Sequence, residues 1–184
     1  MPMPVLTVCG VAELAEHSGR SVTHVVTLLD PGSPEPAGLA GFAPHRRHII
    51  HFHDILVPRP GQPGPTEAIV AGLLQLGRDV ERRHGHLLVH CHAGVSRSTA
   101  TMLMLMAQAN PDQPADHLFE RLVAIRPQAW PNSVMVGFAD SQLGRAGALT
   151  MALRRHYGRQ LTARPEFRDW MTDLGRQSEL DMAL

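Results

Sequence analysis

The sequence of 184 residues contains no lysine, so that all 17 of its basic side chains are arginines. Every fixed positive charge is therefore a planar guanidinium, which stays protonated and can bind two oxygens of a carboxylate or phosphate at once. The 17 basic residues are balanced by 17 acidic ones. A net charge of zero removes the electrostatic reason to expect a nucleic acid or an acidic membrane surface as a partner.

Cysteine is also scarce, with Cys9 and Cys91 as its two occurrences. Two cysteines are too few for a disulfide framework, and they lack the pair spacing of a zinc site. The chain does not open with a basic segment followed by a long apolar one, and none of its apolar runs approaches the length of a membrane span. We therefore expect a soluble, cytoplasmic protein without membrane insertion.

Aromatic residues make up only 4% of the chain, but hydrophobic residues make up 43%, which is ample for the core of one domain. Short β-branched or apolar segments predict strands at residues 5–8, 23–29, 48–52 and 86–90. Helical spacing and capping residues predict helices at residues 11–17, 66–83, 96–109, 113–125, 132–143 and 147–157. Strands come early and helices late, which indicates an α/β fold with a small central mixed or parallel sheet flanked by helices.

A thiol and an arginine lie close together where the fourth expected strand ends, in the stretch LLVHCHAGVSRSTATMLM. The strand ends at His90, a loop of small residues follows Cys91, and a helix begins at about Arg97. Such a loop can fold into a cup of inward-pointing N–H groups, to which the helix N-terminus adds a partial positive charge. The cup would fit a tetrahedral dianion.

The same cup would act on the cysteine. A thiol at a helix N-terminus beside a guanidinium is typically ionised near neutral pH, and the thiolate is the nucleophilic form. Arg97 could hold two phosphate oxygens at once. Nucleophile and anion clamp would then come from one segment of seven residues, Cys91 to Arg97.

The pattern His90-Cys91-x-x-Gly94-x-x-Arg97-Ser98 resembles the signature loop of the cysteine-dependent protein tyrosine phosphatase superfamily. The small size resembles its dual-specificity-like branch, and the likeness covers roughly residues 5–143. The resemblance implies a phosphotyrosine-phosphatase-like fold and a metal-independent phosphoric monoester hydrolase without a cofactor. Its substrate would be a phosphoprotein or a small phosphomonoester.

The resemblance also implies roles for single residues. Cys91 would attack phosphorus, Arg97 would hold the equatorial oxygens, and Ser98 would bond to the sulfur and ease its departure. His90 would bond to the loop backbone and keep the cup in shape. The phosphate-binding loop itself would consist of His92, Ala93, Gly94, Val95, Ser96 and Arg97.

In the family, an aspartic acid on an upstream loop protonates the leaving oxygen and then deprotonates the attacking water. Asp54 is our candidate, because it follows the third expected strand and opens a loop rich in proline and glycine. Asp30 remains an alternative, although it begins a turn, where aspartate is common for local hydrogen bonding. Asp79 lies in a helical pattern between charged neighbours and fits a solvated surface better.

Further along, Ile125-Arg126-Pro127 and Pro131-Asn132 resemble the segment behind the signature helix in dual-specificity-like phosphatases. We expect Arg126 and Asn132 to be structural supports of the loop. A catalytic domain would span residues 1–157, followed by a C-terminal tail, residues 158–184. In the tail Phe167, Trp170, Met171 and Leu174 form one stripe of an amphipathic helix, which we expect to dock on the domain.

Other chemistries stay open at this stage. His51, His53 and Asp54 could hold a metal ion in a metal-dependent hydrolase, although alternation along a strand turns Asp54 away from the two histidines. The loop could also bind phosphate without catalysis, or belong to a sulfurtransferase or arsenate reductase. A redox partnership between Cys9 and Cys91 is a further hypothesis.

The variable positions of the loop bear on the substrate. They are occupied by His92, Ala93, Val95 and Ser96, so only His92 could carry a charge. This disfavours a polyanionic lipid headgroup and favours a phosphoprotein or an aryl phosphate.

Overall fold

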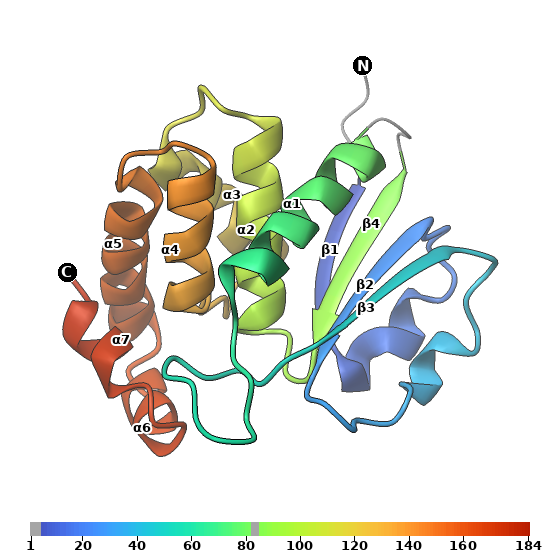
Figure 1. Ribbon diagram of the computed structural model, residues 1–184, viewed down its shortest axis with the longest axis horizontal. Coiled ribbons are helices and arrows are strands. Elements are labelled where there is room, and N and C mark those ends of the chain that lie inside the picture. Colours follow the sequence, from blue (N-terminus) through green and yellow to red (C-terminus); the bar gives the residue numbers. More distant parts are fainter. Residues whose placement is uncertain (1–4, 82–84) are drawn as a thin grey trace.

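The computed structural model describes residues 5–81 and 85–184 (Figure 1). Four parallel strands form one sheet in the order β1-β4-β2-β3. Their bounds are Val5–Gly10 for β1, His24–Leu29 for β2, Arg46–His51 for β3 and His86–Cys91 for β4. The expected α/β fold with a small central sheet is confirmed, and the four strands lie at the predicted places.

The α-helices gather on one side of the sheet, and two short 3₁₀ helices cover the other side (Figure 1). The helix expected at residues 66–83 is α1, whose described part ends at Glu81, so that Arg82 and Arg83 lie outside the described residues. The bounds are η1 Val11–His17, η2 Ala37–Leu39, α1 Glu67–Glu81, α2 Arg97–Ala109, α3 Ala115–Ile125, α4 Ser133–Gln142, α5 Ala148–Ala163, α6 Phe167–Asp173 and α7 Gln177–Met182.

The two faces of the sheet bury different side chains, because successive residues of a strand point to opposite sides. Val26, Leu28 and Val89 belong to the main core between the sheet and the α-helices. Val25 and Leu88, which directly precede Val26 and Val89, belong to a smaller cluster under η1 and η2. Every position of β2 and β4 is therefore buried, as expected for a sheet covered on both faces, and most of these positions are apolar.

Helix α2 lies at the centre of the helical layer, packed against α1, α3, α4 and β4. Its residues are buried from Arg97 to Ala107. Because β4 leads directly into the loop before α2, the segment that joins them is fixed at both ends by buried elements. The candidate phosphate loop thus lies at the carboxyl end of a central strand, where parallel α/β sheets carry their ligand sites.

The tail differs in part from the expectation. Phe167 and Met171 of the apolar stripe are buried, but Trp170 and Leu174 are 36% and 55% exposed. The stripe therefore docks through only two of its four side chains, because α6 ends at Asp173 and the chain turns away at Gly175 into α7. Helix α5 runs through residue 157, so the tail leaves the preceding domain as a continuation of this helix. Within residues 5–81 and 85–184, we find no helix with the length and apolarity that crossing a bilayer requires.

Candidate active site

The loop between Cys91 and Arg97 turns its carbonyl groups outward. The carbonyls of His92, Val95 and Ser96 accept hydrogen bonds from backbone N–H groups at distances of 2.9 to 3.0 Å, with donors at Val11, Trp130 and Ala100. Within the described part of the chain, the N–H groups of residues 92–96 donate to no acceptor. Outward carbonyls and unbonded amides are the arrangement that binds an anion on the inner side of a loop.

Gly94 is required by the shape of this loop. Its φ of +69° lies in the left-handed region, and a Cβ at this position would lie 2.4 Å from the carbonyl carbon of Cys9. Glycine alone combines this backbone conformation with so close an approach to β1. The loop therefore rests directly on the end of the neighbouring strand.

Arg126 contacts the loop between Cys91 and Arg97, for which we expected it to be a structural support. Its guanidinium donates to the carbonyls of Gly94 and Ala93 at 2.9 and 3.1 Å. It also forms a two-bond ion pair with Glu13, both at 2.8 Å. Glu13 in turn accepts a hydrogen bond from Gly10 N, at the end of β1. Arg126 holds the pKa of Glu13 below its usual value, so the pair stays charged near neutral pH.

Cys91 and Ser98 meet at the base of the cup. The distance between Cys91 Sγ and Ser98 Oγ is 3.1 Å, within hydrogen-bonding range for sulfur. Cys91 is 3% exposed and Ser98 is fully buried. The sulfur thus has a hydroxyl beside it on α2 and the unbonded loop amides around it.

Arg97 lies at the first turn of α2, with its side chain almost fully buried. Nη1 donates to Asp30 Oδ1 at 2.7 Å and to the Phe52 carbonyl at 2.5 Å. The guanidinium lies over the ring of Phe52, 5.7 Å from its centroid. Nε has no hydrogen-bond partner among the described residues, although it is buried. A buried donor without an acceptor is costly, which indicates that this side of Arg97 is built to receive an anion.

Asp54 lies beside the other end of the loop. Its Oδ1 accepts hydrogen bonds from Ser96 Oγ at 2.8 Å and from Asn132 Nδ2 at 3.0 Å. It also pairs with Arg176 Nη2 at 2.5 Å. Asn132 Oδ1 caps α4 by accepting from the N–H groups of Val134 and Met135, so this side chain joins the helix to the carboxylate. Asp54 is therefore tied to the loop between Cys91 and Arg97.

His90 contacts a neighbouring strand. Its Nε2 lies 2.8 Å from Thr27 Oγ1, a side chain of the paired strand β2. Burial lowers the pKa of His90 to about 4, so the ring is neutral near pH 7. The expected bond to the loop backbone stays a prediction, with the Cys91 backbone as a neighbour that opposes the lowering of this pKa, and Thr27 is an additional side-chain partner. The ring holds β4 to β2 just before Cys91.

The two cysteines lie on opposite faces of the sheet. Cys9 belongs to the small cluster with Leu14 and Leu88, whereas Cys91 belongs to the main core. Both thiols are free. Burial, helped by the charge of Glu13, raises the pKa of Cys9 to about 12. The hypothesis of a redox partnership is not supported, because the Cys9 thiol is protonated at neutral pH and turned away from Cys91.

The proposed metal ligands do not gather into a site. His51 is exposed at the end of β3, and Nδ1 of His53 lies 3.3 Å from the Pro63 carbonyl. Across residues 5–81 and 85–184, three side chains of the metal-binding types do not come together anywhere. The arrangement of these residues therefore does not favour the alternative of a metal-dependent hydrolase.

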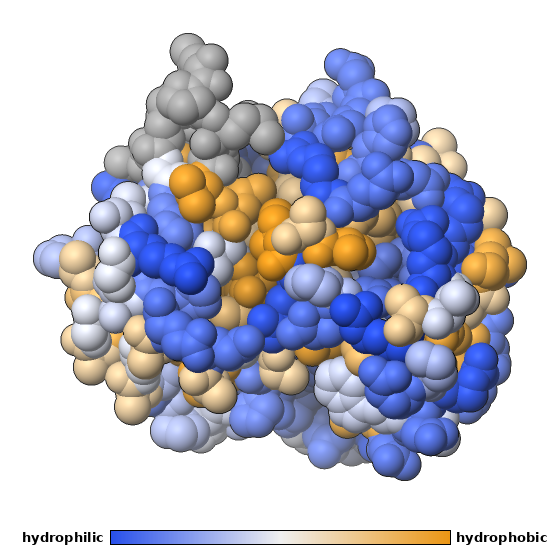
Figure 2. All heavy atoms as spheres, turned by 180° about the vertical axis from the view of Figure 1, so that it is seen from behind, coloured by the Kyte–Doolittle hydropathy of each residue, from blue (hydrophilic) through white to orange (hydrophobic). Residues whose placement is uncertain are grey.

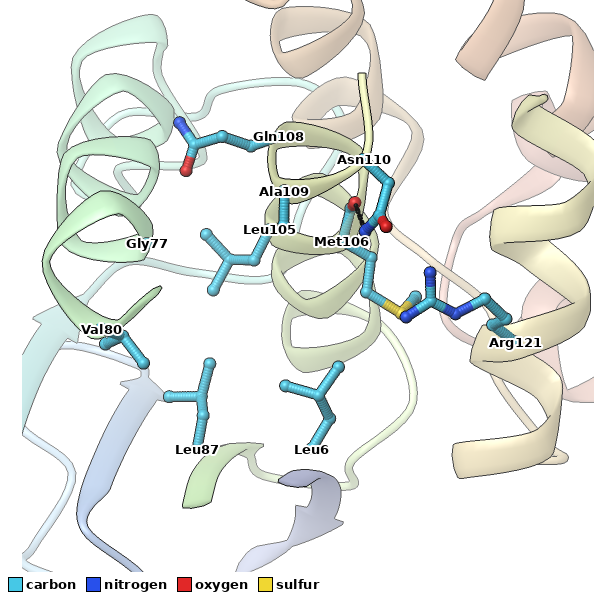
Figure 3. Close-up of a pocket in the computed structure, with 10 residues that line it drawn as sticks. All are labelled: Leu6, Gly77, Val80, Leu87, Leu105, Met106, Gln108, Ala109, Asn110 and Arg121. Carbon is cyan, nitrogen blue, oxygen red and sulfur yellow. Dashed lines mark hydrogen bonds between the residues drawn. The ribbon is translucent and has the colours of Figure 1, made fainter. Parts of the chain in front are cut away.

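An apolar hollow lies on the face opposite to that of Figure 1 (Figure 2). Leu6 of β1, Leu87 of β4 and Leu105 of α2 point into it, and Arg121 of α3 closes one side (Figure 3). Leu87 precedes Cys91 by four strand residues, a separation of about 13 Å. The hollow thus belongs to the amino ends of β1 and β4, away from the cup.

Three residues around the loop, Glu13, Arg97's partner Asp30 and Arg176, were not assigned these contacts from the sequence. For Glu13 the sequence does contain a signal, since an acidic residue three positions after Gly10 fits a capping pattern at the start of a helix. The pairing of Arg97 with Asp30 and that of Arg176 with Asp54 had none. They join residues 67 and 122 positions apart, and only the folded chain brings them together.

The sequence matches no family model and no curated protein. Solved structures do match it. Human DUSP28 has 18% identity and a TM-score of 0.57 over 79% of this chain and 96% of that one. The human tyrosine phosphatase-like serine/threonine/tyrosine-interacting protein has 17% identity and a TM-score of 0.59, over 78% of this chain and 94% of that one.

DUSP15 has 21% identity and a TM-score of 0.55, over 88% of this chain and 93% of that one. The similarity therefore extends over nearly the whole length of these proteins. Since the identities are low, the likeness concerns the fold. The chain has the fold of these three solved structures, in agreement with the phosphotyrosine-phosphatase-like fold that the resemblance of residues 90–98 implied.

Proposed function

We propose that this chain is a phosphoric monoester hydrolase, a protein tyrosine or dual-specificity phosphatase that works through a cysteinyl-phosphate intermediate. One observation carries the proposal. Cys91 Sγ lies 3.1 Å from Ser98 Oγ, in a loop whose amide groups find no acceptor in the described chain and whose arginine is buried. These are the parts needed to hold a phosphate dianion against a nucleophilic sulfur.

In the first step, three phosphate oxygens enter the cup and bind its N–H groups. Arg97 exchanges Asp30 and the Phe52 carbonyl for two of these oxygens. The Cys91 thiolate then attacks phosphorus, so that a sulfur–phosphorus bond forms while the bond to the leaving oxygen breaks. Asp54 gives its proton to that oxygen.

In the second step, water attacks phosphorus and Asp54 takes a proton from it. The sulfur–phosphorus bond breaks, inorganic phosphate leaves, and Cys91 returns to its thiolate form. The hydroxyl of Ser98 is placed to donate a hydrogen bond to the sulfur as negative charge returns to it. The chemistry needs no metal or cofactor.

Asp54 is favoured over Asp30 as the acid because of its contacts. Asp54 bonds to Ser96 of the loop, and its Oδ2 is free of hydrogen bonds to the described residues. Asp30 bonds to Arg97, the group that must turn to the phosphate. A carboxylate engaged by the anion clamp is a counterion for it, whereas one fixed beside the loop can meet the leaving oxygen.

The loop also supports the proposed class of substrate. His92 and Ala93 are exposed at its rim, whereas Val95 and Ser96 are buried. The rim thus presents no arginine for additional phosphate groups, in line with a phosphoprotein or aryl phosphate. The test is to compare kcat/KM for phosphotyrosine, phosphoserine and phosphothreonine peptides with kcat/KM for a phosphoinositide. We expect the phosphopeptides to be the better substrates.

We also place the activity in the cytoplasm, because the proposed nucleophile must remain a free thiol. Both cysteines of this chain are free. A reducing compartment keeps such thiols from forming disulfides.

The substitution Cys91→Ser tests the proposed function. Turnover of p-nitrophenyl phosphate should be abolished, while binding of inorganic phosphate is retained, because the amides and Arg97 remain in place. Steady-state kinetics measure the first, and calorimetry the second. Cys9→Ala serves as the control, since this thiol lies on the other face of the sheet and should be dispensable.

Retained turnover by Cys91→Ser would refute catalysis by this thiol. If the unmodified protein binds phosphate but hydrolyses none of the phosphopeptides or aryl phosphates, the chain is a phosphate-binding module without catalysis.

A further inference from the structure

The C-terminal tail reaches the proposed active site. Helices α6 and α7 pack beneath α4 and α5, beside the loop that follows β3 (Figure 1). Phe167, Met171 and Leu180 anchor the tail in the core. Between the two helices, Arg176 is 3% exposed and points into the domain. A buried guanidinium is costly unless it is paired, so its partners indicate why it is there.

Arg176 joins two carboxylates. Nη1 pairs with Glu179 Oε2 at 3.0 Å, and Nη2 pairs with Asp54 Oδ1 at 2.5 Å. Nη2 also lies 3.3 Å from the Asp54 carbonyl. Burial alone would lower the pKa of Arg176, but the charges of Asp54 and Glu179 outweigh it and raise this pKa. The guanidinium is therefore a permanent charge beside Asp54.

Glu179 fixes the arginine to the rest of the domain. Its side chain is fully buried and accepts hydrogen bonds from Trp130 Nε1 at 2.7 Å and from Ser133 N at 2.8 Å. Ser133 is the first residue of α4, which Asn132 caps. The tail, the start of α4 and the loop after β3 thus form one connected network around Asp54.

The contacts to Asp54 converge on one of its oxygens. Ser96, Asn132 and Arg176 all donate to Oδ1, and among the described residues none donates to Oδ2. A carboxyl group held in this way cannot exchange its two oxygens without breaking three bonds. Oδ2 is left as the oxygen that can carry a transferable proton.

From this network we infer that Arg176 is a positioning residue for Asp54, and that the C-terminal tail is a working part of the active site. The inference rests on the proposed function, in which Asp54 is the general acid and base. Arg176 holds Oδ1 so that Oδ2 faces the leaving oxygen and then the attacking water. Ser96 and Asn132 share this task, but only Arg176 brings a charge and depends on the docked tail.

The test compares Arg176 variants on two substrates, p-nitrophenyl phosphate with a good leaving group and phenyl phosphate with a poor one. A conservative variant, Arg176→Lys, keeps the charge but reaches one carboxylate at a time. A second variant, Arg176→Met with Glu179→Gln, removes both members of the fully buried pair, so that Glu179 is not left as an unpaired buried charge. Asp54, which is 25% exposed, keeps its hydrogen bonds from Ser96 and Asn132. Arg168→Met, on the exposed side of α6, is the matched control.

We expect the double variant to lose about tenfold in kcat on phenyl phosphate and little on p-nitrophenyl phosphate, because only the poor leaving group needs the proton. Arg176→Lys should retain part of the activity that the double variant loses. In a background of Asp54→Asn, the same changes should cause no further loss, since their effect passes through Asp54. Arg168→Met should match the unmodified protein on both substrates.

Two results would overturn the inference. One is an equal loss on both substrates, and the other is a loss that adds fully to that of Asp54→Asn. Either result would mean that the tail supports the structure in general and does not act through Asp54. A lowered melting temperature of the variants would show such a structural role independently. Neither touches the proposed function, which fails instead if Cys91→Ser remains active.

Discussion

Asp30 and Asp54 follow the paired strands β2 and β3, and each pairs with one arginine, but they are held very differently. The side chain of Asp30 is 51% exposed and meets Arg97 through one oxygen at 2.7 Å. The side chain of Asp54 is 25% exposed, and its Oδ1 accepts from three donors on three different segments. One carboxylate is loosely placed, and the other is locked.

The difference indicates two roles for two similar groups. A half-exposed partner contributes about 1 kcal/mol or less to an ion pair, so an arriving phosphate can displace Asp30 from Arg97 at small cost. Asp54 cannot be displaced so easily, because its network is mostly buried. We therefore propose that Asp30 serves as the counterion of Arg97 until a phosphate replaces it, and that Asp54 is a fixed part of the reacting site.

Arg97→Lys tests the proposed role of Arg97, whose guanidinium bonds to Asp30 before the substrate binds and to the phosphate afterwards. An ammonium keeps the charge but cannot hold two oxygens in one plane, so kcat/KM for p-nitrophenyl phosphate should fall by about 10²–10³. Arg46→Lys, at an exposed position of β3, is the control. Near-normal kinetics of Arg97→Lys would show that holding two oxygens is not needed.

Asp54→Asn tests the locked carboxylate. The amide can still accept hydrogen bonds at Oδ1 but has no proton to give, so turnover of phenyl phosphate should fall by about 10², the low end for general acid catalysis. Turnover of p-nitrophenyl phosphate should fall much less. The measurement is the ratio of kcat values for the two substrates, with Asp169→Asn on the exposed face of α6 as control. A uniform drop would point to another acid.

These contrasts also show what the sequence can and cannot reveal. The strand ending at Cys91, the loop and helix α2 were predictable, because apolar runs, small residues and helical spacing act within a few residues of each other. Arg126 behind the loop came from the family resemblance. By contrast, Trp170 lies in the same helical stripe as Met171, yet only the second is buried. Burial of a stripe depends on how far the rest of the domain extends over it.

The side-chain contacts of Asp30 and Asp54 could not be predicted either, because they also depend on how distant parts of the chain pack together. Asp30 and Asp54 both follow an expected strand, and turn formation explains a strand-end aspartate as well as catalysis does. What separates Asp54 is Arg176, which is 122 residues away and has an ordinary neighbourhood in the sequence. Contacts of this kind follow from packing of the tail, which the pattern of the tail alone does not specify.

Asp30→Asn is expected to have the smallest effect and gives the sharpest check of the comparison. The amide can still accept a hydrogen bond from Arg97 but no longer offers a charge that competes with phosphate. Inhibition by inorganic phosphate should therefore strengthen, by about fivefold at most, since an exposed pair contributes about 1 kcal/mol or less. The kcat values for phenyl and p-nitrophenyl phosphate should stay in their original ratio. If the ratio instead falls for Asp30→Asn and holds for Asp54→Asn, the roles are reversed. The locked carboxylate would then be structural, and the loosely held one would carry the proton.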